Sequence, residues 1–364
     1  MNAPPRVAAY VYPGWHPIAE RDLNFHPGFT EWELVLGCRP RFEGHHQPRE
    51  PALGPYDDRD PQEVGRRIRL AQAHGVDAFV YGVFWCRGKR VFEEALDLGF
   101  LPGAPGAPFA LMWANRMPRR VLPVARPEIE VIDPSRRVSS DVADFVALID
   151  LLARRYFHRP EYLRIDGRPY FSIFDTTFFV RELGPAAAKE AIAAAQVHLQ
   201  KLGFPGLHLG AIDPAPEVIG QVAQLGFASV THYVLLPYWR GPSLQPYAET
   251  AAARATEWPG YRTQSGLPYF PSVAPGWDAS PRGADFGPKR PDKYPWSPVV
   301  TGEDPAEFRI ALARALRFAQ AEGAPLSFIA SLNEWSEGHY LEPDRRFGNG
   351  WLEAVRAALQ DVGW

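Results

Sequence analysis

Short apolar runs recur along the chain, and segments with helical periodicity separate them. A near-continuous apolar run of six to eight residues is typical of a parallel strand that is buried on both faces. The pattern predicts eight such strands, at Arg6–Tyr12, Val76–Gly82, Pro108–Trp113, Pro169–Phe174, Leu207–Ile212, Ala228–Tyr233, Leu267–Val273 and Pro325–Leu332.

Four of the intervening helices are recognisable from their ends. They run from Asp60 to about His74, from Asp141 to about Tyr156, from Pro185 to Leu202 and from Asp304 to Ala321. Each begins with an Asp cap or a proline, and most have a glycine near the end. Strands that alternate with helices pair in parallel, and eight such units favour closure. We therefore predict an α/β fold, a single-domain (β/α)8 TIM barrel spanning residues 1–364.

Three long insertions follow the first, third and seventh predicted strands. They cover Pro13–Gln62, Ala114–Asp141 and Ala274–Asp304, and they are rich in Pro, Gly, Arg and aromatic residues. All three leave the carboxyl ends of strands, where α/β barrels carry their active sites. The composition favours ordered binding loops. For Pro281–Trp296, disorder is the alternative.

The last apolar run ends in a group of polar residues that includes two glutamates. Asn333 follows Leu332, and Glu334 and Glu337 lie three residues apart. If the backbone turns helically after Asn333, residues three apart share one face, roughly 5 to 6 Å apart at Cβ. Two carboxyl groups could then reach one glycosidic bond. The structural alternative is that one of these glutamates caps a loop or pairs with an arginine.

The other strand ends carry aromatic and polar residues of the kind that bind sugars. Aromatic rings pack against the C–H faces of saccharides, while carboxylates and amides bond their hydroxyl groups. The residues in question are Tyr12, Trp15, Trp85, Trp113, Asn115, Asp175, Asp213, His232, Tyr233, Trp277 and Asp278. This mixture predicts a carbohydrate cleft, although any single tryptophan could instead anchor the core or a loop.

Charge and composition exclude several classes of partner. Lys and Arg number 39 against 42 Asp and Glu, a net charge of -3, so no basic field attracts nucleic acid or anionic membranes. A neutral or mildly charged substrate fits better. Because no apolar run approaches about 18 residues, we expect no membrane span. The start of the chain lacks signal-peptide features, which predicts a cytoplasmic protein. Cys38 and Cys86 are expected to be free thiols.

We expect neither a metal nor another cofactor. His45 and His46 are adjacent and point apart in an extended chain, and no carboxylate falls at a facial-triad spacing. The Asp-x-Asp within residues 57–60 could hold a divalent ion in a nucleotide-sugar transferase, but helix capping before Pro61 explains it more simply. The chain has no Rossmann glycine fingerprint and no phosphate-binding loop. The oligomeric state is not predicted.

A series of ordered motifs resembles the WbsX-type proteins, which are similar to glycoside hydrolase family 99. The resemblance runs from about Arg6 to Asp344. Its main motifs are Tyr10-Val11-Tyr12-Pro13, Gly28-Phe29-Thr30-Glu31-Trp32, Trp113-Ala114-Asn115, Pro275-Gly276-Trp277-Asp278 with Pro281-Arg282, and Asn333-Glu334-Trp335-Ser336-Glu337-Gly338 with Leu341-Glu342-Pro343. Members have been labelled glycosyltransferases, whereas the kinship to family 99 implies hydrolysis.

The resemblance implies a role for each glutamate. Glu334 would be the base on a sugar 2-hydroxyl and Glu337 the general acid on the leaving oxygen, through a 1,2-anhydro sugar and with overall retention. The route requires O2 anti to the leaving group, as in an α-mannoside. The acid should have a raised pKa from burial or a neighbouring carboxylate. The binding shell is expected to comprise Asn333, Trp335, Tyr12, Glu31, Trp113, Asn115, His232, Trp277, Asp278 and Arg116.

The sequence thus predicts a retaining glycoside hydrolase that acts on a bacterial polysaccharide or oligosaccharide. The first alternative is a glycosyltransferase of O-antigen or capsule assembly, which predicts nucleotide-sugar binding. The second is a non-catalytic glycan-binding barrel. The presence of both Glu334 and Glu337 argues against it, because binding alone needs no acid beside a base.

One departure from the family pattern generates a prediction. WbsX-type proteins usually carry Glu after Trp-Ala-Asn, whereas this chain has Arg116, with Arg119 and Arg120 nearby. A cation in place of a carboxylate should favour an anionic sugar, such as a uronate or a phosphorylated or sulfated residue. We expect Arg116→Glu to lower turnover of charged glycans relative to neutral ones. An unchanged ratio would show the idea to be wrong.

Overall fold

The computed structural model describes residues 4–115, 140–286 and 294–364 of the chain. Its central sheet follows the order β10-β12-β1-β2-β4-β6-β7-β8, with every neighbouring pair parallel. These strands are β1 (Arg6–Val11), β2 (Ala78–Cys86), β4 (Phe109–Trp113), β6 (Arg168–Ile173), β7 (His208–Ile212), β8 (Ser229–Thr231), β10 (Ser272–Val273) and β12 (Leu326–Ile329). All eight overlap the predicted apolar runs, although β2 continues past Gly82 to Cys86 and β6 begins one residue early, and the order confirms the TIM-like fold.

The two ends of this sheet meet and nearly close the barrel. A parallel bridge joins Val230 of β8 to Tyr269, in the segment that leads into β10. Val230 donates its N–H to the Pro268 carbonyl and accepts from Phe270 N–H, each at 2.9 Å. The predicted run Leu267–Val273 is therefore longer than the regular strand within it.

Aromatic rings fill the interior of the barrel. Tyr10 stacks on Phe328 with ring centroids 5.1 Å apart, and Tyr170 lies 5.9 Å from the same ring. Each of the three is buried. Because side chains fill both faces of every strand, the runs carry little polar alternation.

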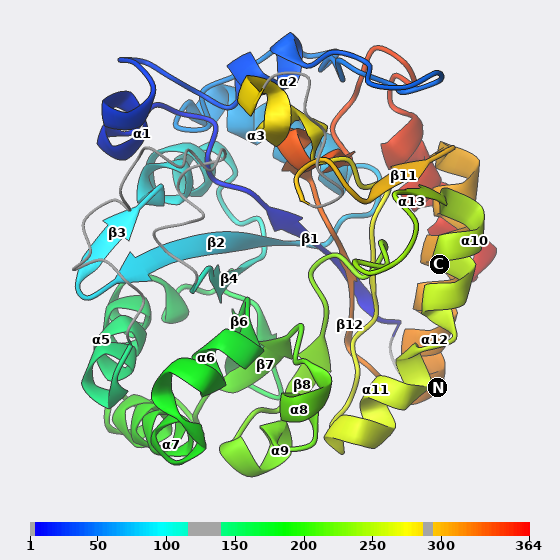
Figure 1. Cartoon of the computed structure of the whole chain (residues 1–364). Helices are drawn as coiled ribbons and strands as arrows, with labels where there is room; N and C mark the ends of the chain where they lie inside the picture. The colour runs from blue at the N-terminus through cyan, green and yellow to red at the C-terminus, as the bar shows by residue number, and fades with distance from the viewer. Residues whose placement is uncertain (1–3, 116–139, 287–293) are drawn as a thin grey trace.

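Helices surround the barrel (Figure 1), and the four predicted ones are present. They are α3 (Pro61–Gln72), α5 (Val142–Leu152), α7 (Pro185–Lys201) and α12 (Pro305–Glu322). Asp60, Asp141 and Asp304 cap three of them by accepting backbone N–H bonds, as their sequence positions predict. A π-helix, Ala153–Phe157, continues α5 to the predicted end.

The remaining elements are mostly short. The helices are α4 (Leu101–Gly103), α6 (Thr176–Leu183), α8 (Pro216–Ile219), α9 (Val222–Leu225), α10 (Tyr247–Ala255), α11 (Trp258–Ser265), α13 (Gly350–Asp361) and a π-helix at Ala95–Phe100. Two antiparallel strands, β3 (Lys89–Val91) and β5 (Arg164–Ile165), extend β2 and β6. Among the described residues, no helix is both long and apolar enough to cross a membrane.

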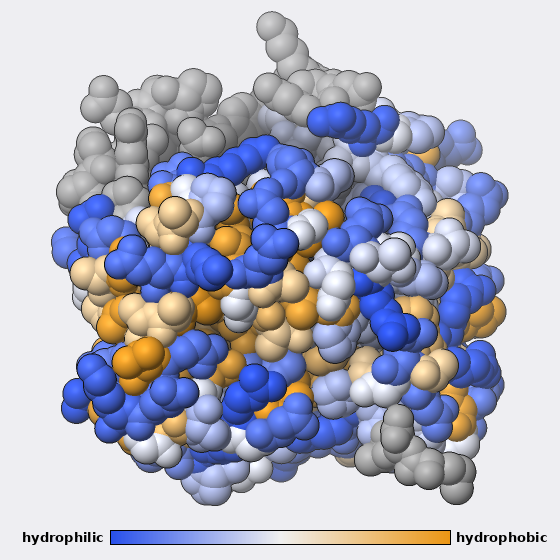
Figure 2. All heavy atoms as spheres, turned by 90° about the horizontal axis from the view of Figure 1, so that it is seen from below, coloured by the Kyte–Doolittle hydropathy of each residue, from blue (hydrophilic) through white to orange (hydrophobic). Residues whose placement is uncertain are grey.

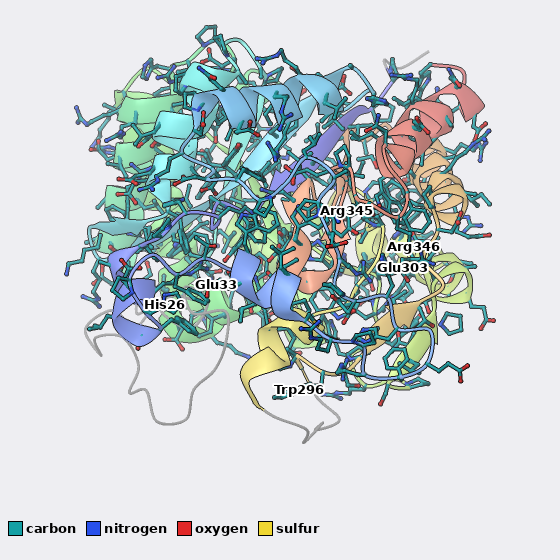
Figure 3. The ribbon with its side chains drawn as sticks, turned by 90° about the horizontal axis from the view of Figure 1, so that it is seen from above. His26, Glu33, Trp296, Glu303, Arg345 and Arg346 are labelled. Atoms are coloured by element: carbon teal, nitrogen blue, oxygen red, sulfur yellow. The ribbon has the colours of Figure 1, made fainter. Side chains whose placement is uncertain are left out.

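The insertions build one face over the carboxyl ends of the strands. The first holds α1 (Ala19–Asn24) and α2 (Trp32–Gly37). The last holds a 3-10 turn, Ser280–Phe286, and β11 (Val299–Thr301), which pairs with β9 (Leu244–Pro246). Figure 3 shows the barrel from the side, with Trp296 labelled beside the turn at the lower edge of the picture. The described residues of Pro281–Trp296 are therefore ordered. Residues 287–293 of this segment, and residues 116–139 of the second insertion, lie outside the described part.

The side of the barrel that Figure 2 shows is a conventional surface. The view is from below Figure 1, and apolar residues are interspersed there with hydrophilic ones. The long loops with their aromatic and charged residues belong to the face over the carboxyl ends of the strands, so the chemistry is sought there.

Candidate active site

A tight hairpin after β12 holds the two glutamates. Asn333–Glu334 (β13) pairs with His339–Tyr340 (β14), and a 3-10 turn, Trp335–Glu337, connects them. The helical turn expected after Asn333 is therefore present. Gly338 closes it at φ +70°, and a Cβ there would lie 2.8 Å from the Asp278 amide nitrogen. Because only glycine fits this conformation and this approach, the hairpin geometry is set by the sequence.

Arg282 is the centre of the site. Its guanidinium contacts Glu337, lies 3.2 Å from Glu334 Oε1 and 3.2 Å from Glu31 Oε2, and its Nε is 3.2 Å from Ser336 Oγ. Arg282 is 7% exposed. One buried cation therefore links the two carboxylates of the hairpin to a third, Glu31, from a distant part of the chain. The alternative that one of the strand-end glutamates pairs with an arginine also holds, since Arg282 contacts both.

Glu334 lies in an environment that favours its neutral form. Burial, and then the charge of Glu337, raise the pKa of Glu334, while His339, Arg282 and a hydrogen bond from Tyr233 oppose the rise. The Tyr233 hydroxyl donates to Glu334 Oε2. Burial and Glu334 raise the pKa of Tyr233 well above its ordinary value, so this phenol stays a donor. Two carboxylates this close share protons as a pair.

Glu31 supplies the third carboxylate, at the start of α2. Tyr12 donates its hydroxyl to Glu31, and Arg21 Nη2 lies 2.5 Å from Glu31 Oε1. Burial alone would raise the pKa of Glu31, but Arg282 and Arg21 outweigh it and lower that pKa. The two arginines thus favour the ionised form of Glu31, which contacts the same Arg282 Nη2 as Glu334 does. Tyr12 and Glu31, both predicted as binding residues, thus lie at the site.

Aromatic rings form the adjacent wall. The His339 ring stacks on Trp277, with centroids 5.5 Å apart, and meets Tyr233 edge-on at 5.8 Å. His339 Nε2 lies 3.5 Å from Glu337 and 3.7 Å from Glu334. Tyr294 donates its hydroxyl to Glu337 at 2.8 Å. Trp277, also predicted to bind substrate, is therefore placed behind the imidazole that touches both glutamates.

Glu334, Glu337 and His339 have ligand atoms within 4.8 Å of one another, a spacing that a divalent cation could use. The spacing argument made from sequence did not anticipate this cluster. The Arg282 guanidinium already places a positive charge on both carboxylates, which disfavours a second cation. In a second cluster, His16 with Asp57 and Asp58, both aspartates already have partners. The expectation of a metal-free site stays a prediction.

Three further predicted residues are near the hairpin but are occupied by protein partners. The Asn333 amide bridges the Tyr12 backbone, accepting at 2.8 Å and donating at 3.0 Å. Trp335 is fully buried, stacks on Tyr340 at 3.6 Å and donates to Glu342 at 2.7 Å. Asp278 accepts from His45 and Gln47, each at 2.7 Å. These contacts give all three a structural role, and their role in binding substrate stays a prediction.

The remaining predicted residues lie on the β4 to β8 side of the barrel. The Trp113 indole donates to the Trp85 carbonyl at 3.3 Å, and the Asn115 amide pairs with the Asp175 backbone at 2.9 Å in both directions. Burial lowers the pKa of His232 to about 3, and its Nδ1 lies 2.9 Å from the Tyr269 hydroxyl. None of these contacts reaches the glutamate pair. Arg116, with Arg119 and Arg120, lies outside the described residues.

Three residues of the site were not predicted to react or to bind substrate: Arg282, His339 and Tyr294. Tyr233 was named among the strand-end residues of the predicted cleft, without a role of its own. Arg282 stood in a motif quoted for the family resemblance and His339 lies inside the glutamate motif, so both had a signal. Tyr294 had none, because its loop reaches the site only in the folded chain.

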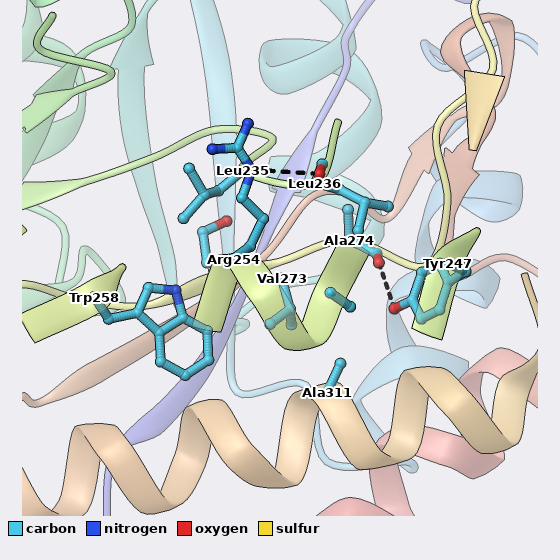
Figure 4. A pocket seen from close by; sticks show the side chains of 10 residues that line it. Leu235, Leu236, Tyr247, Arg254, Trp258, Val273, Ala274 and Ala311 are labelled. Atoms are coloured by element: carbon cyan, nitrogen blue, oxygen red, sulfur yellow. Dashed lines mark hydrogen bonds between the residues drawn. The ribbon is translucent and has the colours of Figure 1, made fainter. Parts of the chain in front are cut away.

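The enclosed cavity shown in Figure 4 is a different feature. It lies between α10, α11, α12 and β10, has a volume of about 20 Å³, and is lined mainly by Leu235, Leu236, Val273, Trp258 and Ala311. This volume holds about one water molecule and no sugar. The glutamate hairpin, with 5% and 4% of Glu334 and Glu337 exposed, remains the candidate active site.

Solved structures with a similar fold include glycosidases. Two structures of the GH99 endo-alpha-mannosidase from Bacteroides thetaiotaomicron, one in complex with BIS-TRIS-Propane, align with a TM-score of 0.63 at 17% and 16% identity, covering 98% of this chain and 96% of theirs. A structure described as a glycoside hydrolase-like protein aligns with a TM-score of 0.60 at 15% identity, over 98% and 94%. At these identities the likeness shows a shared fold.

Sequence comparison places the chain in a family. Proteins described as uncharacterized protein WxcX, from two strains of Xanthomonas campestris pv. campestris, are 33% identical over 373 residues. The alignments cover 98% of this chain and 50% of the relatives, so the chain spans about half their length. The family described as Glycosyltransferase WbsX matches residues 7–355. The chain therefore belongs to the WbsX family.

Proposed function

We propose that this protein is a retaining glycoside hydrolase that cleaves an oligosaccharide or polysaccharide with Glu334 and Glu337 as its reacting pair. The observation that carries the proposal is the hairpin that presents both carboxylates, with Arg282 between them and a third carboxylate behind. The full-length likeness to an endo-alpha-mannosidase fold supports the reaction class.

The mechanism uses participation of the sugar's own 2-hydroxyl. Glu334 takes the 2-hydroxyl proton as O2 attacks C1, the bond from C1 to the leaving oxygen breaks, and Glu337 protonates that oxygen. Glu337 then takes a proton from water, which attacks C1 and opens the 1,2-anhydro sugar while Glu334 returns its proton to O2. Two inversions at C1 give retention. The geometry requires O2 anti to the leaving group, which favours an α-mannoside-like linkage.

The contacts in the free protein oppose the protonation states that the mechanism needs. Arg282 and Tyr294 both stabilise the ionised form of Glu337, while burial and the charge of Glu337 raise the pKa of Glu334. Substrate binding must therefore oppose both effects, or the two roles are reversed. His339 Nε2 lies within 3.7 Å of both carboxylates, where a proton that moves between them would pass.

A glycosyltransferase is the second candidate, and the description of the family favours it. Such an enzyme needs a donor nucleotide and groups that hold a diphosphate. At the described site, Arg21 and Arg282 are already paired with Glu31, so neither is free for a phosphate. Hydrolysis is therefore the first function to test.

Conservative variants should separate the two glutamates. We expect Glu337→Gln to lower turnover of oligosaccharides by about 10²- to 10⁴-fold, but far less for an aryl glycoside whose leaving group needs no protonation. Glu334→Gln should lose activity on both substrates, because O2 is not activated in either. Assays against defined α-mannosides, with NMR of the first-formed anomer, measure both effects.

Exposed Glu353 offers a matched control for these variants, since Glu353→Gln should leave turnover unchanged. If Glu334→Gln instead spares the aryl glycoside and Glu337→Gln loses activity on both substrates, the assigned roles of the two glutamates are reversed. Turnover that requires a nucleotide sugar would replace the hydrolase with a transferase. Activity lost on EDTA treatment and restored by a divalent ion would overturn the metal-free expectation.

The acidic limb of kcat/KM should lie above the ordinary glutamate pKa of 4.5. The proposed base must be ionised, and burial together with Glu337 raises the pKa of Glu334, so activity should fall while the solution is still only mildly acidic. Tyr233→Phe removes a hydrogen bond that opposes this rise and should move the limb to higher pH. Tyr162→Phe, in the barrel wall, is the control. If Tyr233→Phe instead shifts the alkaline limb of the kcat/KM profile, Glu334 is the acid.

Arg282 should be a positioning residue on which stability also depends. Arg282→Met leaves three buried carboxylates without their shared cation, which should lower the free energy of unfolding by roughly 3–5 kcal/mol. In the wild type the lowered pKa of Glu31 adds stability above pH 4.5 that is lost as the pH falls through its folded pKa. The difference between the proteins, measured by urea denaturation, should thus be largest near pH 7 and shrink as the pH falls below 4.5.

Arg345→Met is the matched control for the arginine variant. Arg345, labelled in Figure 3, is exposed and pairs with Glu50 at 3.4 Å. An exposed pair contributes at most about 1 kcal/mol. Equal losses for Arg345→Met and Arg282→Met would contradict the central role of Arg282.

A further inference from the structure

An exposed tryptophan lies next to the candidate active site. Trp239 is 53% exposed and meets Trp277 edge-on, with centroids 5.0 Å apart and planes at 84°. Trp277 stacks on His339, whose Nε2 lies 3.5 Å from Glu337. Aromatic contacts therefore run without a break from the reacting carboxylates to a solvent-exposed indole.

The loop that carries Trp239 is held by its backbone. The buried Gln245 side chain accepts from Tyr238 N–H at 2.8 Å and donates to the carbonyls of Tyr238 and Pro242 at 2.8 and 2.9 Å. Gly241 N–H closes the turn on Tyr238 at 2.9 Å. The Arg254 guanidinium lies 3.7 Å above the Tyr238 ring. The position of Trp239 is therefore set by its neighbours and needs no burial of its own.

The same framework fixes Trp239 relative to Trp277. The loop continues into β9, which pairs with β11 at Leu244 and Val299. Val300 of β11 donates its N–H to the Trp277 carbonyl at 2.8 Å. Two loops from different strands thus hold the indoles in one arrangement before any ligand arrives. A contact surface organised in advance loses less conformational entropy on binding.

We propose that Trp239 is a stacking platform for a second sugar ring, next to the residue that reacts at Glu334 and Glu337. The inference rests on the proposed function and extends it, because it makes the substrate an oligosaccharide with at least one further residue beyond the cleaved linkage. An exposed indole offers a large, flat and rigid apolar face, which matches the C–H face of a pyranose. Its continuity with Trp277 and His339 favours a sugar over a protein partner.

Calorimetry on an inactivated protein tests the platform. In a Glu337→Gln background, we would titrate α-linked manno-oligosaccharides of two, three and four residues into proteins that also carry Trp239→Ala, Trp239→Phe or Leu244→Ala. Trp239→Ala should weaken binding of the longer sugars by about five- to tenfold, and the disaccharide by less. Trp239→Phe should recover most of the affinity. Leu244, 45% exposed on adjacent β9, is the control, and its variant should bind as the parent does.

The outcomes distinguish failure of the Trp239 platform from failure of the proposed hydrolase function. A loss that grows with sugar length in Trp239→Ala, but not in Leu244→Ala, supports the platform. Equal binding in Trp239→Ala and its parent overturns the platform while leaving the hydrolase intact. A change of oligomeric state between Trp239→Ala and its parent in size-exclusion chromatography also overturns the platform, because the indole would then belong to a protein interface. If no manno-oligosaccharide binds, the platform for this sugar class is wrong; the hydrolase fails separately if Glu337→Gln retains full turnover.

Discussion

The contact of Arg282 with three buried carboxylates is the interaction on which the site depends. Glu31 comes from the loop after β1, Arg282 from the loop after β10, and Glu334 with Glu337 from the hairpin after β12. Each carboxylate alone would be costly to bury as an ion. The guanidinium offsets that cost for all three and also joins the loops that carry them. The contacts that balance the charges therefore also fix the positions of the loops.

The barrel supplies the fixed frame that this constraint requires. β1 and β12 are neighbours, and the Asn333 amide ties their ends through the Tyr12 backbone. Gly338 then turns the hairpin so closely against Asp278 that no side chain fits. Asp278, held by His45 and Gln47, anchors the first insertion to the last. Asn333 and Asp278, predicted from the sequence as sugar ligands, thus support the hairpin that carries the proposed reacting pair.

The strands and the long helices could be predicted because their signals are local. A buried strand is an apolar run in the sequence. Three of the helix starts are indicated by an aspartate whose side chain caps the first turn: Asp60, Asp141 and Asp304. Short α8 and α9, with four residues each, carry too little periodicity to be recognised. The partners of a polar side chain are not local: nothing in the sequence separates Glu31, which faces Arg282, from Asp278, which faces His45. The Arg282 cluster and the clamped Trp239 loop therefore emerge only in three dimensions.

The charge of the cluster explains why the roles of its two glutamates are so sensitive to what binds there. Arg282 and Arg21 face Glu31, Glu334 and Glu337, so two cations oppose three carboxyl groups and one proton can neutralise the remainder. In the free protein, burial and the charge of Glu337 raise the pKa of Glu334. A sugar hydroxyl that donates to Glu334 would lower that pKa, and a glycosidic oxygen that accepts from Glu337 would favour the protonated form of Glu337. In the proposed mechanism, the substrate's own hydrogen bonds thus convert an ion-pair network into an acid beside a base.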